Sequence, residues 1–436
     1  MTEVPSPDVN SPSEPERREK KQNLLQTLGP GLITDASDDD PSGIATYSQV
    51  GAQFGYGLLW SMLFSYPLMA TIQEISARLG RVTGHGIAGN LLRHYAPGLM
   101  WSVTALLVVA NIINLGADIG AMGEAVRLLI GGPALLYAAV IAAISVALQV
   151  FVPYTRYTRV LKWLTVSLLA YVATVFVVKV PWGAALKATF LPHLSWQASS
   201  VQALVAVLGT TISPYLFFWQ ASGEVSEMDT HALENPLRQA PQQAPAQFRR
   251  IRTDTFVGMA FSNLVAFFII LTAAVTLHAT GKTVIQTSAQ AAEALRPVAG
   301  PFAFVLFAAG IVGTGLLALP VLAGSAGYAL GEALHWPVGL ERKPYQARGF
   351  YLIITVATLL GLTLDFLHVD PIKALYYSAI INGVSAAPIM VLIMLMTSNP
   401  RVMGQFTVTG WLKWLGWAGT TVMTLAVIAL FVFRSQ

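Results

Sequence analysis

Residues 29–55 read GPGLITDASDDDPSGIATYSQVGAQFG, an apolar stretch with charged and helix-breaking residues at its centre. The interrupting residues are Asp35, Asp38, Asp39, Asp40, Pro41 and Gly43. A continuous lipid-facing helix would not tolerate this set, because Pro41 cannot donate a backbone hydrogen bond and Gly43 adds conformational freedom. Main-chain carbonyls near Ser37 therefore lose their helical partners. The stretch predicts a discontinuous membrane helix with backbone oxygens available as ligands.

The composition of the whole chain agrees with a membrane protein. Of the 436 residues, 54% are hydrophobic and 11% are charged, whereas an ordinary soluble domain carries roughly 25% charged residues. So few charges would not cover a water-soluble protein of this length, which argues against soluble enzymes and nucleic-acid-binding proteins. The chain has no cysteine, which excludes disulfides, thiolate metal sites and cysteine nucleophiles. We therefore expect an all-α integral membrane protein that is not an enzyme.

Eleven hydrophobic segments follow one another along the chain. They lie near residues 30–52, 56–78, 99–130, 133–153, 159–180, 200–223, 252–278, 299–333, 347–364, 371–397 and 411–433. Residues 1–26 contain no apolar run and predict a disordered cytoplasmic tail rather than a signal peptide. The polar stretch 231–252 indicates a flexible connector.

The basic residues predict the orientation of these spans. With the N-terminus inside, most of the 26 Lys and Arg residues fall on the inner side, as the positive-inside rule expects, and the C-terminus lies outside. An even number of spans would instead place both termini on one side. The compact loops favour a multi-pass protein of a bacterial inner membrane.

A second interruption occurs in the sixth segment. Residues 208–222 read LGTTISPYLFFWQAS, in which Pro214 breaks the helical pattern five spans after the first break. An odd interval inverts the direction of equivalent helices, so the pair of breaks predicts a LeuT-like inverted 5+5 repeat with discontinuous spans 1 and 6. The predicted transporter domain covers 27–436, with repeat one at 30–180, repeat two at 200–397 and an eleventh span at 411–433. Each break taken alone is also compatible with a proline kink.

The two breaks offer chemistry suited to a cation. A carboxylate at bilayer depth costs about 3 kcal/mol or more unless it is compensated, so Asp40 needs a cation or a proton. Oxygen atoms of Ser37, Thr210 and Ser213 would surround it. Carboxylates, carbonyls and hydroxyls are hard ligands, which Mg, Mn and Ca ions prefer. Cation transport is the function that this set favours.

These residues resemble the NRAMP family of divalent metal transporters. The resemblance rests on DPSG at 40–43, on the proline-broken sixth span, and on GYGLLWSMLFSYPLMATIQEISARLGRVTGHG at 55–86. It implies Asp40 as the charged metal ligand and main-chain carbonyl ligands from Ser37 and Thr210. Gly43 falls where the family has a metal-binding Asn, Ser213 where it has a metal-binding Met, and Tyr215 where it has a His.

These differences bear on the choice of ion. A thioether is a soft ligand that favours transition metals, so its replacement by the Ser213 hydroxyl weakens discrimination against Mg²⁺. The resemblance implies import of Mn²⁺ or Fe²⁺ by alternating access as the first choice. Family relatives without the Met are similar to magnesium transporters, so a magnesium transporter of the same fold is the alternative.

Further polar residues in the spans suggest an ion or proton pathway. Family members carry an Asp and a Glu on the third span as a proton route, where this chain has Asn111 and Asn114, which do not titrate. Proton coupling is therefore in question. Asp118 continues the same helical face and is either a substitute titrating group or a buried hydrogen-bonded acid. Asp39 is either a second ligand or part of a solvated funnel mouth or a helix-end cluster.

The roles of three more polar side chains also have two alternatives each. Asn382, in the tenth span, is a candidate metal ligand or a helix-to-helix hydrogen-bond donor. Gln220 and Glu224, one turn apart on the sixth span, either line the exit path or form an ordinary cytoplasmic helix end. Glu124 lies three residues from Arg127, which predicts a local ion pair near the outer end of the third span.

Rival transport classes remain at this point. Sodium-coupled amino-acid transporters share the predicted architecture, but an Asp at the break would repel a substrate carboxylate. A cation channel is the other alternative. The expected partners are the divalent ion and the lipid bilayer, with no nucleic acid and no cofactor, and the protein is expected to be a monomer.

Overall fold

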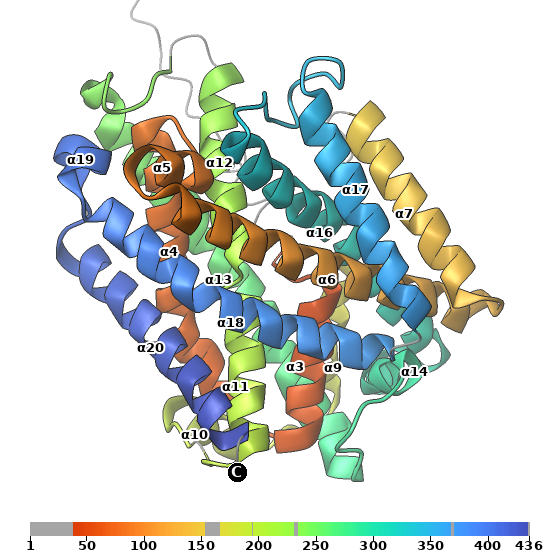
Figure 1. The fold of residues 1–436 in the computed structure, drawn as a ribbon. Helices are drawn as coiled ribbons and strands as arrows, with labels where there is room; N and C mark the ends of the chain where they lie inside the picture. The colour runs from red at the N-terminus through yellow and green to blue at the C-terminus, as the bar shows by residue number, and fades with distance from the viewer. Residues whose placement is uncertain (1–37, 153–165, 194, 231–233, 368–369, 435–436) are drawn as a thin grey trace, which may run out of the picture.

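The fold is given by a computed structural model, which describes residues 38–152, 166–193, 195–230, 234–367 and 370–434. These residues form helices and connecting turns without a strand. The predicted tail at 1–26, Ser37 and the first half of the first span lie outside the described residues. Figure 1 shows a bundle of long helices crossing one another at various angles.

Each predicted segment corresponds to a helix in the described part of the chain, and the sixth segment to a pair of helices. The helices are α3 (Pro41–Phe54), α4 (Leu59–Thr83), α6 (Pro97–Ile130), α7 (Ala134–Phe151), α9 (Leu169–Val177), α11 (Ala198–Thr211), α12 (Pro214–Thr230), α13 (Ala244–Thr276), α16 (Ala303–Ala333), α17 (Arg348–Leu364), α18 (Pro371–Thr397) and α20 (Gly410–Arg434). Among the described residues, seven helical stretches are long and apolar enough to cross a membrane. The chain is therefore a multi-pass membrane protein.

Shorter helices occupy the connections between the long ones. They are α5 (Ile87–His94), α10 (Trp182–Phe190), α14 (Ser288–Ala292), α15 (Arg296–Ala299) and α19 (Pro400–Met403). We call the end of the bundle that carries α5 and α19 the inner end, since it is the predicted cytoplasmic side. The outer end carries α10 and α14 (Figure 1).

The prediction of a flexible connector at 231–252 is wrong for the residues that the structure describes. The amides of Leu237 and Arg238 donate to the carbonyls of Arg81 and Val82, at 3.1 and 3.2 Å, and so hold the connector against the end of α4. Helix α13 begins at Ala244, eight residues before the predicted start of the seventh span. The polar first turns of α13 therefore extend the helix beyond its apolar part.

Helix α6 occupies the centre of the bundle and packs against α16, α7, α17 and α18 (Figure 1). On its other side lies α3, which packs mainly against α13 and α18. Helix α11 approaches α18 very closely at Gly209, where a Cβ atom would lie 2.0 Å from the carbonyl oxygen of Ala379. Large apolar side chains on the periphery remain exposed, among them Ile144, Leu359 and Leu425. Such a surface suits contact with lipid tails.

Candidate functional site

The first break places Asp40 at the start of α3. The backbone of Asp40 is extended, with φ −69° and ψ 170°, and the helix begins at Pro41, whose missing amide hydrogen is not needed in the first turn. Oδ1 of Asp40 accepts a 2.6 Å hydrogen bond from the amide of Gly43. Asp40 is only 2% exposed. Gly43 thus contributes its backbone amide to the site and orients the Asp40 carboxylate.

The second oxygen of Asp40 faces two other helices. Asn114 of α6 donates from Nδ2 to Oδ2 of Asp40 at 3.2 Å. Tyr215, in the first turn of α12, donates from its hydroxyl to the same oxygen at 3.3 Å. The carboxylate therefore lies where α3, α6 and α12 meet. Of the sequence-predicted site residues, Asp40, Gly43 and Asn114 are brought together by these contacts.

The break in the sixth span separates α11 from α12. Helix α11 ends at Thr211, Ile212 adopts φ −118° and ψ 60°, and α12 starts at Pro214. The Ser213 hydroxyl donates to the carbonyls of Gly209 and Thr210 at 2.8 and 2.9 Å. These carbonyls are among those that the proline leaves without helical partners. The Ser213 hydroxyl therefore supplies hydrogen bonds to backbone carbonyls at the helix break.

Thr210 is linked to the first break through a tyrosine. Its hydroxyl donates to the Tyr47 hydroxyl at 3.0 Å and to the carbonyl of Val207 at 2.9 Å. Tyr47 belongs to α3 and is 1% exposed. The two discontinuous spans are thus joined directly by a buried hydrogen bond between side chains.

Asp39 and its neighbour Asp38 point towards α13. The hydroxyl of Ser262 donates to Oδ2 of Asp38 at 2.7 Å and lies 3.2 Å from Oδ1 of Asp39. Both aspartates are buried, with exposed fractions of 1% and 4%. Of the alternatives for Asp39, a solvated funnel mouth does not fit this structure, because protein surrounds the side chain, whereas a cluster at the end of a helix does, since Asp38 and Asp39 directly precede the N-cap of α3.

The other predicted pathway residues take different positions. Asn111 donates from Nδ2 to the Leu322 carbonyl and the Ser325 hydroxyl of α16, at 2.9 and 2.8 Å, and makes none of the Asp40 contacts. Asp118 is fully buried on α6. Asn382 and Gln220 are buried on α18 and α12, and each has a side-chain oxygen without a hydrogen-bond partner.

Glu224 belongs to a cluster of ion pairs at the inner end. Its side chain is completely buried and pairs with Arg250 of α13 at 2.5 Å, and Arg250 also pairs with Glu227 at 3.0 Å. Nearby, the fully buried side chain of Arg81 pairs with Glu234 at 2.5 Å. Glu224 is therefore a charged tie between α12 and α13, and the choice between an exit path and a cytoplasmic helix end stays a prediction.

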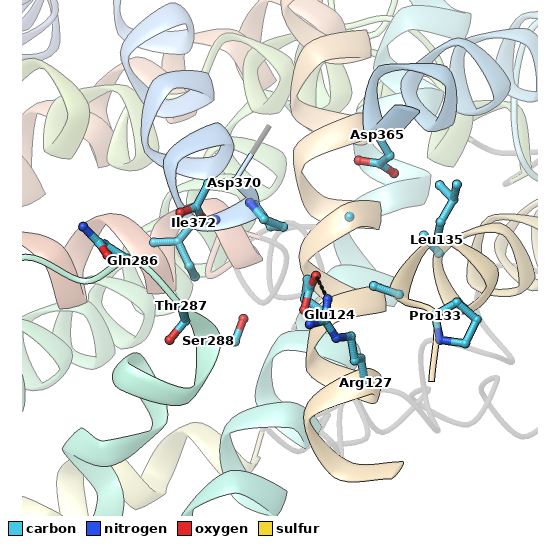
Figure 2. A pocket seen from close by; sticks show the side chains of 14 residues that line it. Glu124, Arg127, Pro133, Leu135, Gln286, Thr287, Ser288, Asp365, Asp370 and Ile372 are labelled. Carbon is cyan, nitrogen blue, oxygen red and sulfur yellow. Dashed lines mark hydrogen bonds and ion pairs between the residues drawn. The ribbon is translucent and has the colours of Figure 1, made fainter. Parts of the chain in front are cut away.

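A cavity of about 570 Å³ opens at the outer end (Figure 2). Acidic and hydroxyl side chains line part of it, from the end of α6, from α14 and from the start of α18: Glu124, Thr287, Ser288, Asp365 and Asp370. Glu124 pairs with Arg127 at 2.9 Å, which confirms the predicted local ion pair. Burial raises the pKa of Asp365, which follows α17, to about 7.

Sequence reasoning missed two residues of the site. The sequence identifies Tyr215 only as the residue in the place of the family's His, although its position next to Pro214 at the start of α12 is a usable signal. Ser262 lies within a long apolar helix, and nothing in its local sequence distinguishes it from other small polar residues. Among the described residues, no three His, Cys, Asp or Glu side chains form a group that could hold a metal by themselves.

Solved structures with the same fold are known. A structure of the Eremococcus coleocola manganese transporter, in complex with an aromatic bis-isothiourea substituted compound, superposes with a TM-score of 0.76 at 18% identity, covering 98% of this chain and 90% of that one. Mhp1, a nucleobase-cation-symport-1 family transporter, gives a TM-score of 0.54 at 14% identity, covering 94% and 92%. These likenesses confirm the predicted all-α, LeuT-like transporter fold. The inverted relation between the two repeats stays a prediction.

Relatives of known function match over nearly the whole chain. The divalent metal cation transporter MntH of Klebsiella pneumoniae (strain 342) is 28% identical over 413 residues, covering 93% of this chain and 92% of the relative. MntH of Deinococcus radiodurans is 28% identical over 406 residues, covering 89% and 87%. These relatives are transporters and not enzymes, in agreement with the prediction. The family model described as natural resistance-associated macrophage protein-like matches residues 31–433, so the chain belongs to the Nramp family, as the sequence predicted.

Proposed function

We propose that this protein imports divalent metal cations by alternating access and that Asp40 is the charged ligand of the transported ion. The observation that carries the proposal is the placement of Asp40, which is buried where the broken helices meet α6. Among the described residues, no lysine or arginine forms an ion pair with it. A carboxylate so far from water needs a cation or a proton, and transporters of this architecture bind their ions at discontinuous helices.

The remaining ligands of the proposed site are oxygen atoms. We assign three oxygen atoms as further ligands of the ion: the main-chain carbonyl oxygens of Ser37 and Thr210 and the side-chain oxygen of Asn382. Oδ1 of Asn382 is buried and has no hydrogen-bond partner among the described residues. Gly43 has no side chain to offer and supports Asp40 through its amide. Ser213 contributes through the backbone that its hydroxyl stabilises. Oxygen ligands suit manganese, ferrous and magnesium ions, which retain part of their water.

Mn²⁺ and Fe²⁺ are the proposed substrates, with weak discrimination against Mg²⁺. The names of the relatives support this choice, since they are divalent metal cation transporters and a manganese transporter. A magnesium transporter is the second candidate, and one observation favours it. Ser213 replaces the soft thioether of the family and directs its hydroxyl to backbone carbonyls, so nothing soft faces the ion.

A proton route through α6 has no titrating group at the family's positions. Asn111 and Asn114 are amides, and Asn114 is occupied in holding Asp40. We therefore propose that ion import does not depend on a proton relay through these two positions. We further propose that the protein lies in the bacterial inner membrane, acts as a monomer, and has its N-terminus in the cytoplasm and its C-terminus outside.

Influx of Mn²⁺ into proteoliposomes that hold the purified protein tests the proposal. We expect influx in the wild type and none in Asp40→Asn, which keeps the shape of the side chain but removes its charge. Asp229→Asn is the control, because Asp229 is an exposed acid at the inner end whose side chain is 57% exposed. Absence of Mn²⁺ influx from the wild type, with and without Mg²⁺, would contradict metal transport.

Competition distinguishes the two candidate substrates. If Mn²⁺ and Fe²⁺ are the substrates, influx survives a large external excess of Mg²⁺ at a reduced rate. If Mg²⁺ abolishes Mn²⁺ influx and itself accumulates in the vesicles, the second candidate is correct. Ser213→Met restores the thioether, and we expect it to improve the preference for Mn²⁺ over Mg²⁺ by roughly tenfold, the equivalent of about 1.4 kcal/mol.

A further inference from the structure

Asp118 of α6 is a buried carboxylate that the contacts described so far leave unused. Its exposed fraction is 0%, and among the described residues no side chain donates a hydrogen bond to either of its carboxylate oxygens. A buried carboxylate is normally paired or hydrogen-bonded, because removing it from water is costly. The side chains that the structure describes therefore leave Asp118 open to a further partner.

The position of Asp118 links it to Asp40. It lies one helical turn after Asn114, which donates to Asp40 at 3.2 Å. The backbone amide of Ser42, in the first turn of α3, interacts with the carboxyl groups of both Asp40 and Asp118. Both carboxyl groups thus lie near the Ser42 amide at the start of α3.

No positive side chain compensates this pair in the described part of the chain. The ionisable side chain that acts on Asp118 is Asp40, which carries a charge of the same sign. Two buried like charges repel each other strongly unless one carboxyl group is protonated or a cation lies between them. A single divalent cation would neutralise both carboxylates, whereas a monovalent cation would leave one buried negative charge.

Neighbouring amide oxygens are also available to a cation. Oδ1 of Asn114 and Oδ1 of Asn382 are both buried and have no hydrogen-bond partner in the part of the chain that the structure describes. Asn114 is fixed at the site by the hydrogen bond of its Nδ2 to Asp40, so its free oxygen lies at the same place. Helix α18, which carries Asn382, packs against both α3 and α6. Such oxygens accept only, so they match a metal ion or its bound water.

We infer that Asp118 is a second carboxylate ligand of the transported ion, so that Asp40 and Asp118 together form a dicarboxylate site for a divalent cation. This inference rests on the proposed function. It assigns selectivity for divalent over monovalent cations to charge balance between two acids rather than to a soft ligand. Asn114 contributes its side-chain oxygen to the same site and orients Asp40.

Binding of Mn²⁺ to the detergent-purified full chain, measured by isothermal titration calorimetry, tests the inference. Asp118→Asn keeps the shape of the side chain, and we expect it to weaken Mn²⁺ binding by about tenfold or more, since affinity follows the charge of the ligand set. Glu124→Gln is the matched control. It removes an acid from the same helix, but one that is already paired with Arg127, and Mn²⁺ binding should not change.

Thermal unfolding separates a ligand from a structural residue. Without metal, Asp118→Asn should be at least as stable as the wild type, because it removes an uncompensated buried charge. Added Mn²⁺ should raise the melting temperature of the wild type clearly and that of Asp118→Asn much less. Unchanged Mn²⁺ affinity in Asp118→Asn would overturn the inference, as would lost transport with unchanged affinity, which would indicate a role in coupling.

The failure of this inference can be distinguished from failure of the proposed function. If the wild type binds no Mn²⁺, Fe²⁺ or Mg²⁺, the proposed function itself is wrong. If the wild type binds Mn²⁺ and Asp40→Asn does not, while Asp118→Asn binds as the wild type does, only the role of Asp118 is wrong. A wild type and an Asp118→Asn variant that are inhibited equally by excess Na⁺ would also contradict the charge-balance argument.

Discussion

Asp365 shows how burial alters the acid chemistry of a single side chain. It follows α17 at the outer end and lies against α6 at Gly120, where a Cβ atom would come within 2.4 Å of its Oδ1. Burial raises its pKa from the ordinary 3.8 to about 7. Because the folded state binds this proton more tightly, the stabilisation is complete below pH 3.8 and is lost as the pH rises through about 7.

We therefore predict that Asp365→Asn makes the stability of the protein less dependent on pH. The melting temperature of the wild type should fall more steeply between pH 4 and pH 7 than that of the variant, since the amide has no proton to lose. Above about pH 7 the variant should be the more stable of the two, because the wild type then buries a charge. Parallel melting-temperature curves for the two proteins across this range would contradict the prediction.

At the residue scale, the sequence indicated the charged residue of the candidate site, Asp40, more directly than the residues that contact it. Asp40 was evident because an acid next to proline in an apolar stretch is costly in lipid and is seldom found there without a functional role. Asn114 followed from its helical spacing and from the resemblance to the family. The contacts of Tyr215 and Ser262 were not predictable, because they depend on how α12 and α13 are placed in three dimensions.

At the scale of elements, the contact between α11 and α18 depends on a glycine. Gly209 lies two residues before the end of α11, and a Cβ atom there would lie 2.0 Å from the carbonyl oxygen of Ala379 and 2.5 Å from the amide nitrogen of Gly383. We predict that Gly209→Ala lowers the free energy of unfolding by about 1–3 kcal/mol, because the helices must separate. Chemical denaturation in detergent measures this change. The affinity for Mn²⁺ should fall as well, since the break between α11 and α12 lies only a few residues after Gly209.

Gly223→Ala is the matched control for this substitution. Gly223 lies in α12, and a Cβ atom there would have no neighbour within 4 Å. Alanine is the better helix former, so this variant should be unchanged or slightly more stable, by up to about 1 kcal/mol. Equal effects of the two substitutions would show that the close approach of α11 and α18 does not determine stability here.

Hydropathy predicted the long helices because each must bury its backbone hydrogen bonds within itself in lipid. The same signal cannot show where a helix continues beyond the apolar region. Helix α13 therefore began earlier than predicted, since its first turns carry polar and basic residues. Short helices such as α5 and α14 were missed for the same reason, because packing against the bundle rather than hydropathy defines them.

At the scale of the whole molecule, the two ends of the bundle differ. The inner end is tied by buried ion pairs, of which Arg250 with Glu224 joins α12 to α13. Glu332 of α16 adds a further tie there, since its carboxylate accepts from the amides of Gly86 and Gly89, at 3.1 and 2.8 Å, at the start of α5. The outer end instead contains the cavity of about 570 Å³ (Figure 2). The alternating access that we propose requires these ties to open when the outer side closes.

We predict that Glu224→Gln shifts the protein towards a state that is open at the inner end. Breaking a buried ion pair outright costs about 3–5 kcal/mol. Glu224→Gln leaves Arg250 paired with Glu227, so the cost is smaller, but a loss of about 1.4 kcal/mol in the state that contains the pair already changes a two-state population about tenfold. The chain has no cysteine, so single reporter cysteines need no altered background. Maleimide labelling should increase at Gln220→Cys on α12 and decrease at Thr287→Cys in the outer cavity.

Opposite changes in labelling at the two ends distinguish a shift between access states from a general loss of structure. If Glu224→Gln merely loosened the fold, both reporter positions would become more reactive, and the melting temperature would fall with them. If the ion pair does not hold the inner end closed, neither position would change. Opposite changes at the two ends, reversed when Arg250 and Glu227 are also replaced by Gln so that Arg250 and both of its acidic partners lose their charges together, would show that the tie between α12 and α13 biases the equilibrium between the two access states.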